Sequence, residues 1–529
     1  MIKTILIFLI IYYPLMCQVW IPDLGDGTYK NPIIFADYSD PDVVRVGDDF
    51  YMTSSSFNCL PALPILHSKD LVNWELINHA VKKFDDPLFD IPQHGNGVWA
   101  PSIRYHNNAF YIYWGDPDRG IFMVKTDDPY GDWEDPVLVK KAYGNIDPCP
   151  LWDDDGKVYL VHAFAHSRAG VKSLLQINEL SADGTHIIDK GRIVFDGHDS
   201  YPTIEGPKIY KKNGYYYIFA PAGGVPTGWQ TVLRSKNIYG PYEDKIVLEQ
   251  GSTKINGPHQ GGWVEFANGE NWFIHFQDKN AYGRIVHLNP VFWKNDWPLM
   301  GEDYDGNGIG EPVTKYRKPE VNKTYPIKTP QTTDEFSDTK LGLQWQWQAN
   351  YSNKWYSLSE YPDNIRLYAI ENSTSFNNLF MIPNMLLQKF PAETFIVTTK
   401  MKPHLNQKGE QAGLIVMGLD YACIRILNQG EKYHLEYATC MGAEDNNKEK
   451  IVSEVLINQD EIYLQVKIEN GALCHFRYSA NGSDFIDIGK VFKAREGKWI
   501  GAKIGLYCIT PNNSRDQDYI DVDWFRFTK

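Results

Sequence analysis

The feature that most constrains the fold is a hairpin pattern that occurs five times before about residue 300. Each copy has a polar turn of Gly, Asn or Asp and an aromatic strand with alternating chemistry, which is typical of a β-hairpin. Four-stranded blades repeat at this spacing, so the pattern predicts a five-bladed β-propeller. The equivalent aromatic positions lie 48 to 60 residues apart and are Tyr51, Tyr111, Tyr159, Tyr217 and Phe273.

The second part of the chain is predicted to be a separate β-domain. A segment rich in Pro, Lys and Thr follows the repeats, and we expect a linker over residues 316–333. Short strands and turns come next, without a long helical periodicity, which predicts a β-sandwich of the jelly-roll or concanavalin-like kind over 334–529. The predicted fold class is therefore all-β, with the propeller over residues 18–315.

The N-terminal segment has the composition of an export signal. Residues 1–17 contain one Lys and an apolar run of about ten residues, which is short for a membrane span. Cys17 stands where a lipoprotein would carry its lipid, but Met16 is larger than the small residue such a signal requires. A lipid anchor and a freely secreted form both stay open. We expect an exported protein, which is periplasmic, secreted or a surface lipoprotein, without a transmembrane segment.

Charge and cysteine content exclude some classes of function. The net charge of -14 disfavours nucleic acid and anionic membranes as partners. The seven cysteines include no CxxC pair, which argues against zinc or thioredoxin-like chemistry. The last four could form disulfides or remain buried thiols, and the sequence does not decide between these alternatives. Aromatic residues make up 14% of the chain, and their flat faces suit sugar rings.

Three acids stand at matching points of different repeats, just before the hairpins: Asp40, Asp147 and Glu205. Asp40 and Asp147 precede proline, so we expect extended backbone there. Each acid taken singly has an ordinary explanation as a turn residue. Together, at equivalent blade positions, they predict three carboxylates around one cavity. Neighbouring carboxylates raise one another's pKa, so one can act as an acid and another as a base, as glycosidic bond cleavage requires.

Five motifs in order resemble glycoside hydrolase family 43. They are "NPIIFADYSDPDVVRVGDDFYM", "GVWAPSIRYHNNAFYIYWG", "IDPCPLWDDDGKVYLVHAF", "IEGPKIYKKNGYYYIFAPAGG" and "GPHQGGWVE", and the resemblance covers residues 30–315. The second half is similar to the C-terminal sandwich of that family through "DEFSDTKLGLQWQWQANY" and "VDWFRF". The branch that it resembles holds β-xylosidases and α-L-arabinofuranosidases.

The resemblance implies a role for each of the three acids. Asp40 matches the general base that activates water, and Glu205 matches the general acid that protonates the leaving oxygen. Asp147 matches the third acid, which orients Glu205 and keeps its pKa high. The family inverts the anomeric configuration, so the base and the acid should stand about 6.5–9.5 Å apart with a water between them.

Four further residues match family positions. Phe57 and Trp99 match aromatics that line the sugar pocket, although both are also ordinary core residues by type. Arg284 matches an arginine that contacts substrate, with a structural ion pair as the alternative. His259 matches a histidine near the propeller axis that helps to hold a metal, usually calcium with water ligands. The resemblance implies no organic cofactor.

The resemblance implies an inverting exo-glycosidase. It would remove terminal β-D-xylosyl or α-L-arabinofuranosyl residues from plant hemicellulose or its oligosaccharides: xylan, arabinoxylan, arabinan or the side chains of xyloglucan. An endo-acting arabinanase and a non-catalytic carbohydrate-binding propeller are the alternatives. We expect the Gly-rich loop 221–230 to form part of the pocket wall, and a structural role for the sandwich is favoured over sugar binding. The oligomeric state is not predicted.

Overall fold

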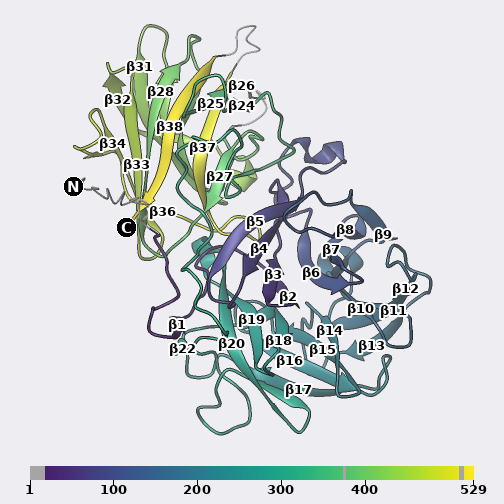
Figure 1. Ribbon diagram of the computed structural model, residues 1–529. Helices are drawn as coiled ribbons and strands as arrows, with labels where there is room; N and C mark the ends of the chain where they lie inside the picture. The colour runs from purple at the N-terminus through teal and green to yellow at the C-terminus, as the bar shows by residue number, and fades with distance from the viewer. Residues whose placement is uncertain (1–17, 373–376, 512–517) are drawn as a thin grey trace, which may run out of the picture.

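The computed structural model describes residues 18–372, 377–511 and 518–529, so the predicted signal over residues 1–17 lies outside the described residues. In the first half of the chain, consecutive strands form five antiparallel sheets of four strands, each in sequence order. These sheets are the blades of a propeller (Figure 1). Their strands are β2 (Asp42–Val46), β3 (Asp49–Thr53), β4 (Ala62–Ser68) and β5 (Trp74–Val81) in blade 1; β6 (Trp99–His106), β7 (Ala109–Asp116), β8 (Gly120–Thr126) and β9 (Val137–Lys141) in blade 2; β10 (Asn145–Trp152), β11 (Val158–Phe164), β12 (Leu174–Leu180) and β13 (Arg192–Asp196) in blade 3; β14 (Lys208–Lys212), β15 (Tyr215–Ala222), β16 (Trp229–Ser235) and β17 (Glu243–Leu248) in blade 4; and β18 (His259–Glu265), β19 (Asn271–Asp278), β20 (Arg284–Lys294) and β21 (Trp297–Met300) in blade 5.

The ring closes through side-chain packing between neighbouring blades. A separate buried apolar cluster lies between each pair of neighbours, including blades 5 and 1. The repeated aromatic residues form part of this packing between blades. Four of them pack toward the next blade: Tyr51, Tyr111, Tyr159 and Tyr217. Phe273 packs toward the preceding blade. The first strands of the blades lie side by side around the axis, from β18 through β2, β6 and β10 to β14.

The segment that enters the propeller is fixed to the last blade. Ile34 exchanges two backbone hydrogen bonds with Val286 of β20, and the Tyr38 amide donates to the Arg284 carbonyl. A short pair of strands, β1 (Thr28–Lys30) with β22 (Lys315–Arg317), joins the start and the end of the propeller. The residues just before Asp40 therefore lie beside the start of β20.

The second half of the chain is a sandwich of two eight-stranded sheets. Its largest apolar cluster joins buried residues from both sheets, as expected for sheets packed face to face. The predicted all-β fold, a five-bladed propeller followed by a β-sandwich, is confirmed. One sheet contains β23 (Gln346–Trp347), β26 (Ile370–Glu371), β27 (Leu386–Lys389), β29 (Gln411–Met417), β30 (Tyr421–Asn428), β31 (Tyr433–Cys440), β32 (Lys450–Ile457) and β37 (Lys503–Thr510), and the other contains β24 (Tyr356–Ser357), β25 (Ile365–Tyr368), β28 (Phe395–His404), β33 (Ile462–Glu469), β34 (Leu473–Ser479), β35 (Ile486–Asp487), β36 (Phe492–Lys493) and β38 (Tyr519–Thr528).

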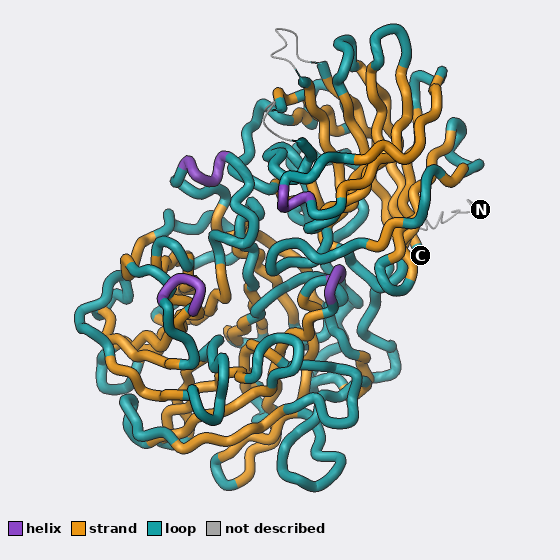
Figure 2. Tube along the Cα trace, turned by 180° about the vertical axis from the view of Figure 1, so that it is seen from behind, coloured by secondary structure: helices purple, strands orange, loops and turns teal. Residues whose placement is uncertain are grey.

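Helices are few and short, as the tube view from behind shows (Figure 2). The described residues form α1 (His166–Ala169) and three single 3-10 turns: η1 (Pro87–Asp90), η2 (Asn280–Tyr282) and η3 (Ala443–Asp445). None of the helices in the described ranges is long and apolar enough to cross a membrane. The four cysteines for which disulfides and thiols were alternatives (Cys423, Cys440, Cys474 and Cys508) are free and buried.

The sandwich packs against the first and last blades. Leu60 of blade 1 and Trp347 of the sandwich exchange two backbone hydrogen bonds. Tyr282 of blade 5 donates its hydroxyl to the Glu393 carbonyl and accepts a hydrogen bond from the Ala472 amide. Phe35 and Tyr282 of the propeller belong to the same apolar cluster as the sandwich core. The two domains therefore share buried surface.

Candidate active site

A backbone bend recurs at the inner end of every blade. One residue before or within the first strand of each blade has a left-handed backbone, and proline follows it in blades 1 to 4. In blades 2, 3 and 5 the bend coincides with a shift in strand register, as in a β-bulge, a device that redirects a side chain beside active sites. The bend residues and their φ angles are Asp40 (53°), Ala100 (39°), Asp147 (57°), Gly206 (59°) and Gln260 (30°).

The predicted extended backbone at Asp40 and Asp147 is wrong. Proline keeps the residue before it out of the right-handed helical region, but both acids are left-handed instead of extended. Asp enters this region more readily than most residues, and the bend turns its side chain out of the strand ladder. Strained backbone that the surrounding structure holds in place is a common property of functional sites.

The bends surround a cavity of about 120 Å³. All seven side chains singled out from the sequence lie in its wall, so the fold brings together residues that are up to 244 positions apart. Val225 of the Gly-rich loop also lines the cavity, as expected for that loop. The lining residues are Asp40, Phe57, Trp99, Ala100, Ile146, Asp147, Glu205, Val225, His259, Gln260, Arg284 and Trp499.

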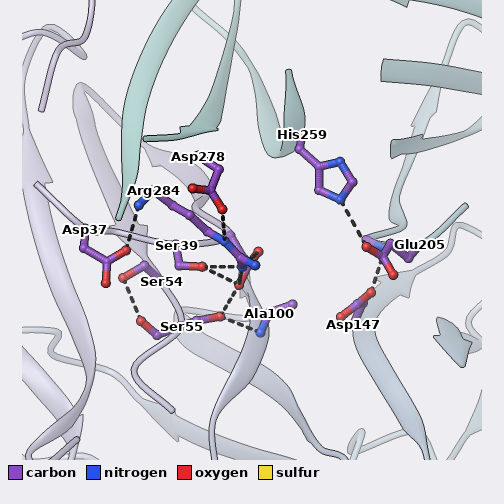
Figure 3. A network of polar contacts seen from close by, with 12 residues as sticks. Asp37, Ser39, Ser54, Ser55, Ala100, Asp147, Glu205, His259, Asp278 and Arg284 are labelled. Atoms are coloured by element: carbon purple, nitrogen blue, oxygen red, sulfur yellow. Dashed lines mark hydrogen bonds and ion pairs between the residues drawn. The ribbon is translucent and has the colours of Figure 1, made fainter. Parts of the chain in front are cut away.

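Asp40 is buried and surrounded by donors. Figure 3 labels the residues that provide them, Ser39, Ser55 and Arg284. Its Oδ2 accepts hydrogen bonds from Ser55 Oγ at 2.5 Å and Ser39 Oγ at 2.8 Å, and Arg284 Nη1 lies 3.0 Å from its Oδ1. The Ser55 hydroxyl is itself held by the Ala100 amide at 2.7 Å. An ionised carboxylate only accepts hydrogen bonds and so matches this set of donors. All of these contacts to Asp40 thus come from groups that donate.

Glu205 and Asp147 lie together on the other side of the cavity, and His259 contacts Glu205 (Figure 3). Asp147 Oδ2 accepts a hydrogen bond of 2.7 Å from the Gly206 amide, so Asp147 fixes the backbone next to Glu205. Glu205 Oε1 lies 3.1 Å from His259 Nε2, and the Glu205 side chain is 31% exposed. Burial and the charge of Glu205 raise the pKa of Asp147 well above its ordinary value. Two close carboxylates of this kind retain a proton between them that a single exposed acid would lose.

Three aromatic side chains form the apolar part of the wall. Phe57 and Trp99 meet edge to face at 6.2 Å, and Trp99 meets Trp499 in the same way at 6.1 Å. Trp499 belongs to the loop between β36 and β37 of the sandwich, so the second domain completes the pocket. Aromatic faces of this kind are suited to the apolar faces of a sugar ring.

Sequence reasoning missed Ser39, Ser55 and Trp499. Ser39 stands directly before Asp40, and Ser55 is the third residue of the polar run "TSSS" after an aromatic strand, so both carried a local signal. Trp499 carried none, because a tryptophan between two glycines in a distant domain has no pattern that points to a pocket. Arg284, predicted to contact substrate, both lines the cavity and pairs with Asp40.

The donor set around His259 does not fit a calcium ion held directly by the protein. Calcium prefers six to eight oxygen ligands, and the described part of the chain holds no group of three or more His, Cys, Asp or Glu side chains that could bind a metal. His259 Nδ1 is buried without a hydrogen-bond partner, which leaves one nitrogen donor. His259 Nε2 instead faces Glu205.

Comparisons with known proteins give the same family for both halves. A family model described as glycosyl hydrolases family 43 matches residues 29–298, and one described as the β-xylosidase C-terminal concanavalin A-like domain matches residues 333–528. A candidate β-xylosidase of Xylanibacter ruminicola is 39% identical, with 92% of this chain and 87% of that protein covered. A non-reducing end α-L-arabinofuranosidase of Bacteroides ovatus is 29% identical, with 95% of both covered. A solved structure of a mutant GH43 protein from Bacillus licheniformis superposes with a TM-score of 0.82 at 26% identity, with 95% of this chain and 99% of that chain covered.

Proposed function

The chain belongs to glycosyl hydrolases family 43, and we propose that it is an inverting exo-glycosidase that removes a terminal pentose from plant hemicellulose or its oligosaccharides. The observation that carries the proposal is the division of the acids in one small pocket. Asp40 lies among four donor contacts, while Glu205 shares its surroundings with the buried Asp147. A base and an acid with different surroundings are what hydrolysis with inversion needs.

The proposed reaction uses two proton transfers. Glu205 donates a proton to the glycosidic oxygen as the bond to the anomeric carbon breaks. Asp40 removes a proton from a water molecule, which attacks that carbon from the opposite face and yields the inverted sugar and a free alcohol. Proton exchange with solvent then returns Asp40 and Glu205 to their starting states. Asp147 holds the Gly206 amide, and so the position of Glu205, during both steps.

The shape of the pocket supports exo action. A cavity of about 120 Å³ is smaller than the roughly 300–1,000 Å³ of pockets for drug-sized ligands, and it suits one sugar residue. Trp499 lies against Trp99 in the cavity wall. An endo-acting enzyme would need an open cleft, through which the substrate chain continues on both sides of the cleaved bond. The arabinanase alternative predicts cleavage inside long chains, which a fall in viscosity of an arabinan solution would reveal.

Two sugars are consistent with the relatives. One relative carries a β-xylosidase name and another is named for α-L-arabinofuranose at the non-reducing end. β-D-Xylopyranose and α-L-arabinofuranose present similar hydroxyl and leaving-group geometry. We propose that the pocket accepts a terminal pentose of this shape, from xylan, arabinoxylan, arabinan or the side chains of xyloglucan.

The first test compares initial rates on p-nitrophenyl β-D-xylopyranoside and α-L-arabinofuranoside. Asp40→Asn should lower kcat by at least about a hundredfold on any substrate, because the general base is lost. Glu205→Gln should lower kcat far more on xylobiose or arabinobiose than on the nitrophenyl sugar, since nitrophenolate leaves without a proton. Asp127→Asn, an exposed change in blade 2, is the matched control. Full activity of Asp40→Asn, or equal losses for Glu205→Gln on both leaving groups, would contradict the roles.

The calcium prediction has its own test. Because His259 offers a single nitrogen and no cluster of metal ligands surrounds it within the described ranges, no step above uses a metal. A calcium ion on the axis would have to be held largely through water. We expect that dialysis against EGTA leaves kcat and the melting temperature unchanged. A loss that Ca²⁺ restores and Mg²⁺ does not would show a functional calcium site.

Export is proposed from the composition of residues 1–17 alone. Cell fractionation of the full chain, beside a Cys17→Ala variant, separates the alternatives. Retention of the wild type in membranes and release of the variant would indicate a lipid anchor, and recovery of both in the medium or periplasm would indicate a free form.

A further inference from the structure

Asp37 is a buried carboxylate that lies outside the cavity wall but contacts both domains. Figure 3 shows its contact with the Arg284 amide. Its Oδ1 accepts a hydrogen bond of 2.9 Å from the Arg284 amide at the start of β20. Its Oδ2 accepts one of 3.0 Å from the Gly501 amide of the sandwich. Gly501 stands two positions after Trp499, and Arg284 pairs with Asp40. One side chain thus joins the strand that carries the arginine to the loop that carries the tryptophan.

Two glycines let the backbone of both domains approach this carboxylate closely. A Cβ on Gly283 would lie 2.5 Å from Asp37 Cγ, so a larger residue there would expel the side chain. A Cβ on Gly501 would lie 2.7 Å from the Gly283 nitrogen, so the backbone of the sandwich loop that carries Trp499 lies directly against the backbone after η2. The Ala502 amide completes the contact with a hydrogen bond of 2.8 Å to the Ala281 carbonyl.

The two partners of Asp37 differ in how firmly they are held elsewhere. Arg284 begins a strand that is paired with β19, and its carbonyl accepts from Tyr38. Beyond Asp37 the loop is held by separate contacts and not by a strand ladder. Leu419 donates to the Glu496 carbonyl, Gly497 donates to Ile500 within the loop, and the Ala502 amide donates to Ala281. At its start, Arg495 pairs with Asp420 and Glu444. Loss of an Asp37 hydrogen bond should therefore affect the loop more than the strand.

We propose that Asp37 is a positioning residue that fixes the Trp499 loop of the sandwich against the pocket of the propeller. Asp37 acts on the pentose site through Trp499 and takes no part in proton transfer. The expected effect on kinetics rests on the proposed function, whereas the effect on the loop does not. Asn at this position keeps the shape but replaces one acceptor oxygen by a donor. One of the two buried amides then has no acceptor, which weakens the contact because a buried donor is left unsatisfied.

A double-mutant cycle tests the proposal in the full chain. Asp37→Asn should lower kcat/KM for the better nitrophenyl pentoside by about tenfold, mainly through KM, with the pH profile unchanged. In a Trp499→Ala background the same change should lower kcat/KM by less than about threefold, because the residue through which it acts is already gone. Asp334→Asn is the matched control, because Asp334 is a partly buried carboxylate that accepts hydrogen bonds from Phe336 and Trp345 away from the pocket. It should change kcat/KM by the same factor in the wild-type and Trp499→Ala backgrounds.

Hydrogen–deuterium exchange gives a second readout that needs no turnover. Peptides covering 495–502 should exchange faster in Asp37→Asn than in wild type, whereas peptides of β20 should not. Equal Asp37→Asn losses in both backgrounds, a shifted pH profile, or unchanged exchange over 495–502 would overturn the proposal. An inactive wild type would count against the proposed function only, since the exchange result still decides the role of Asp37. If Asp37→Asn does not fold, Asp37→Glu enters the same cycle with the same criteria.

Discussion

At the scale of single residues, Asp40 and Asp147 share a left-handed backbone but have opposite surroundings. Asp40 receives hydrogen bonds from two hydroxyls and an arginine, while Asp147 receives one backbone amide and faces another acid. Burial and the neighbouring Glu205 disfavour the charged form of Asp147 and raise its pKa. The two aspartates thus differ in their surroundings although proline follows both, and the proposed roles of base and proton-holding pair rest on this difference.

The raised pKa of Asp147 predicts a dependence of stability on pH. Between the unfolded value of 3.8 and the raised folded value, the folded state binds a proton that the unfolded state has lost. Stability contributed by this group therefore falls as the pH rises through that range. We expect the melting temperature of Asp147→Asn to decline less than that of wild type between pH 4.5 and pH 8, as measured by calorimetry. The alkaline limb of kcat/KM should also move to lower pH in this variant. Parallel melting curves for the two proteins would contradict the assignment.

Much of the residue-level site could be predicted from the sequence because its acids stand in local motifs. Asp40, Asp147 and Glu205 precede hairpins at matching positions. Phe57, Trp99, His259 and Arg284 were predicted only through the resemblance to the family. Trp499 and Asp37 could not be predicted, since their roles arise only where the sandwich meets the propeller. The left-handed φ of Asp40 and Asp147 was also missed. A following proline disfavours the right-handed helical region, but it does not decide between extended and left-handed backbone.

At the scale of secondary-structure elements, the inner strand of each blade is the unit that builds the pocket. Its first residues form the bend, and the remaining residues form the ladder and the packing against the next blade. The repeated aromatic hairpin made the blades predictable, because it recurs with regular spacing. The bends were not predictable, since their residues share no type: Asp, Ala, Gly and Gln occupy the same position.

The bend at Gly206 gives an element-level prediction. A Cβ there would lie 2.2 Å from Gln260 Cγ at a φ of 59°, beside the amide that binds Asp147. Gly206→Ala should lower kcat/KM by about a hundredfold, the usual effect of a small misplacement of a catalytic group. Gly214→Ala in the same hairpin has a φ of 75° and open space, so it should cost about 1–2 kcal/mol of stability with activity unchanged. Equal activities of the two variants in a kinetic assay would show that the bend does not position Glu205.

At the scale of the whole molecule, the two domains pack together around a shared apolar core. The propeller contributes Phe35 and Tyr282 to the apolar cluster of the sandwich, and the sandwich contributes Trp499 to the pocket of the propeller. The sequence predicted two domains because a polar linker separates two kinds of pattern. It could not predict how firmly they pack, because the interface residues are ordinary apolar residues and backbone groups.

The shared core predicts that both domains unfold together. Tyr282→Phe removes a hydroxyl that bonds the Glu393 carbonyl and the Ala472 amide, and the buried amide left without a partner should cost about 1–3 kcal/mol. A single calorimetric transition should move to lower temperature, with the same midpoint by near-UV and far-UV circular dichroism. Tyr361→Phe, an exposed change in the sandwich, should leave the midpoint unchanged. Two separate transitions in Tyr282→Phe would show that the domains unfold independently.

The bend that recurs in each blade also bears on how such a chain can diversify. Ala100 and Gln260 occupy bend positions equivalent to those of Asp40 and Asp147, and both line the same cavity. The proposed reaction assigns a step to neither residue. The ring thus offers two wall positions that are distinct from the three acids, and Ala100 and Gln260 are the natural sites for a library that tests which pentose the pocket accepts.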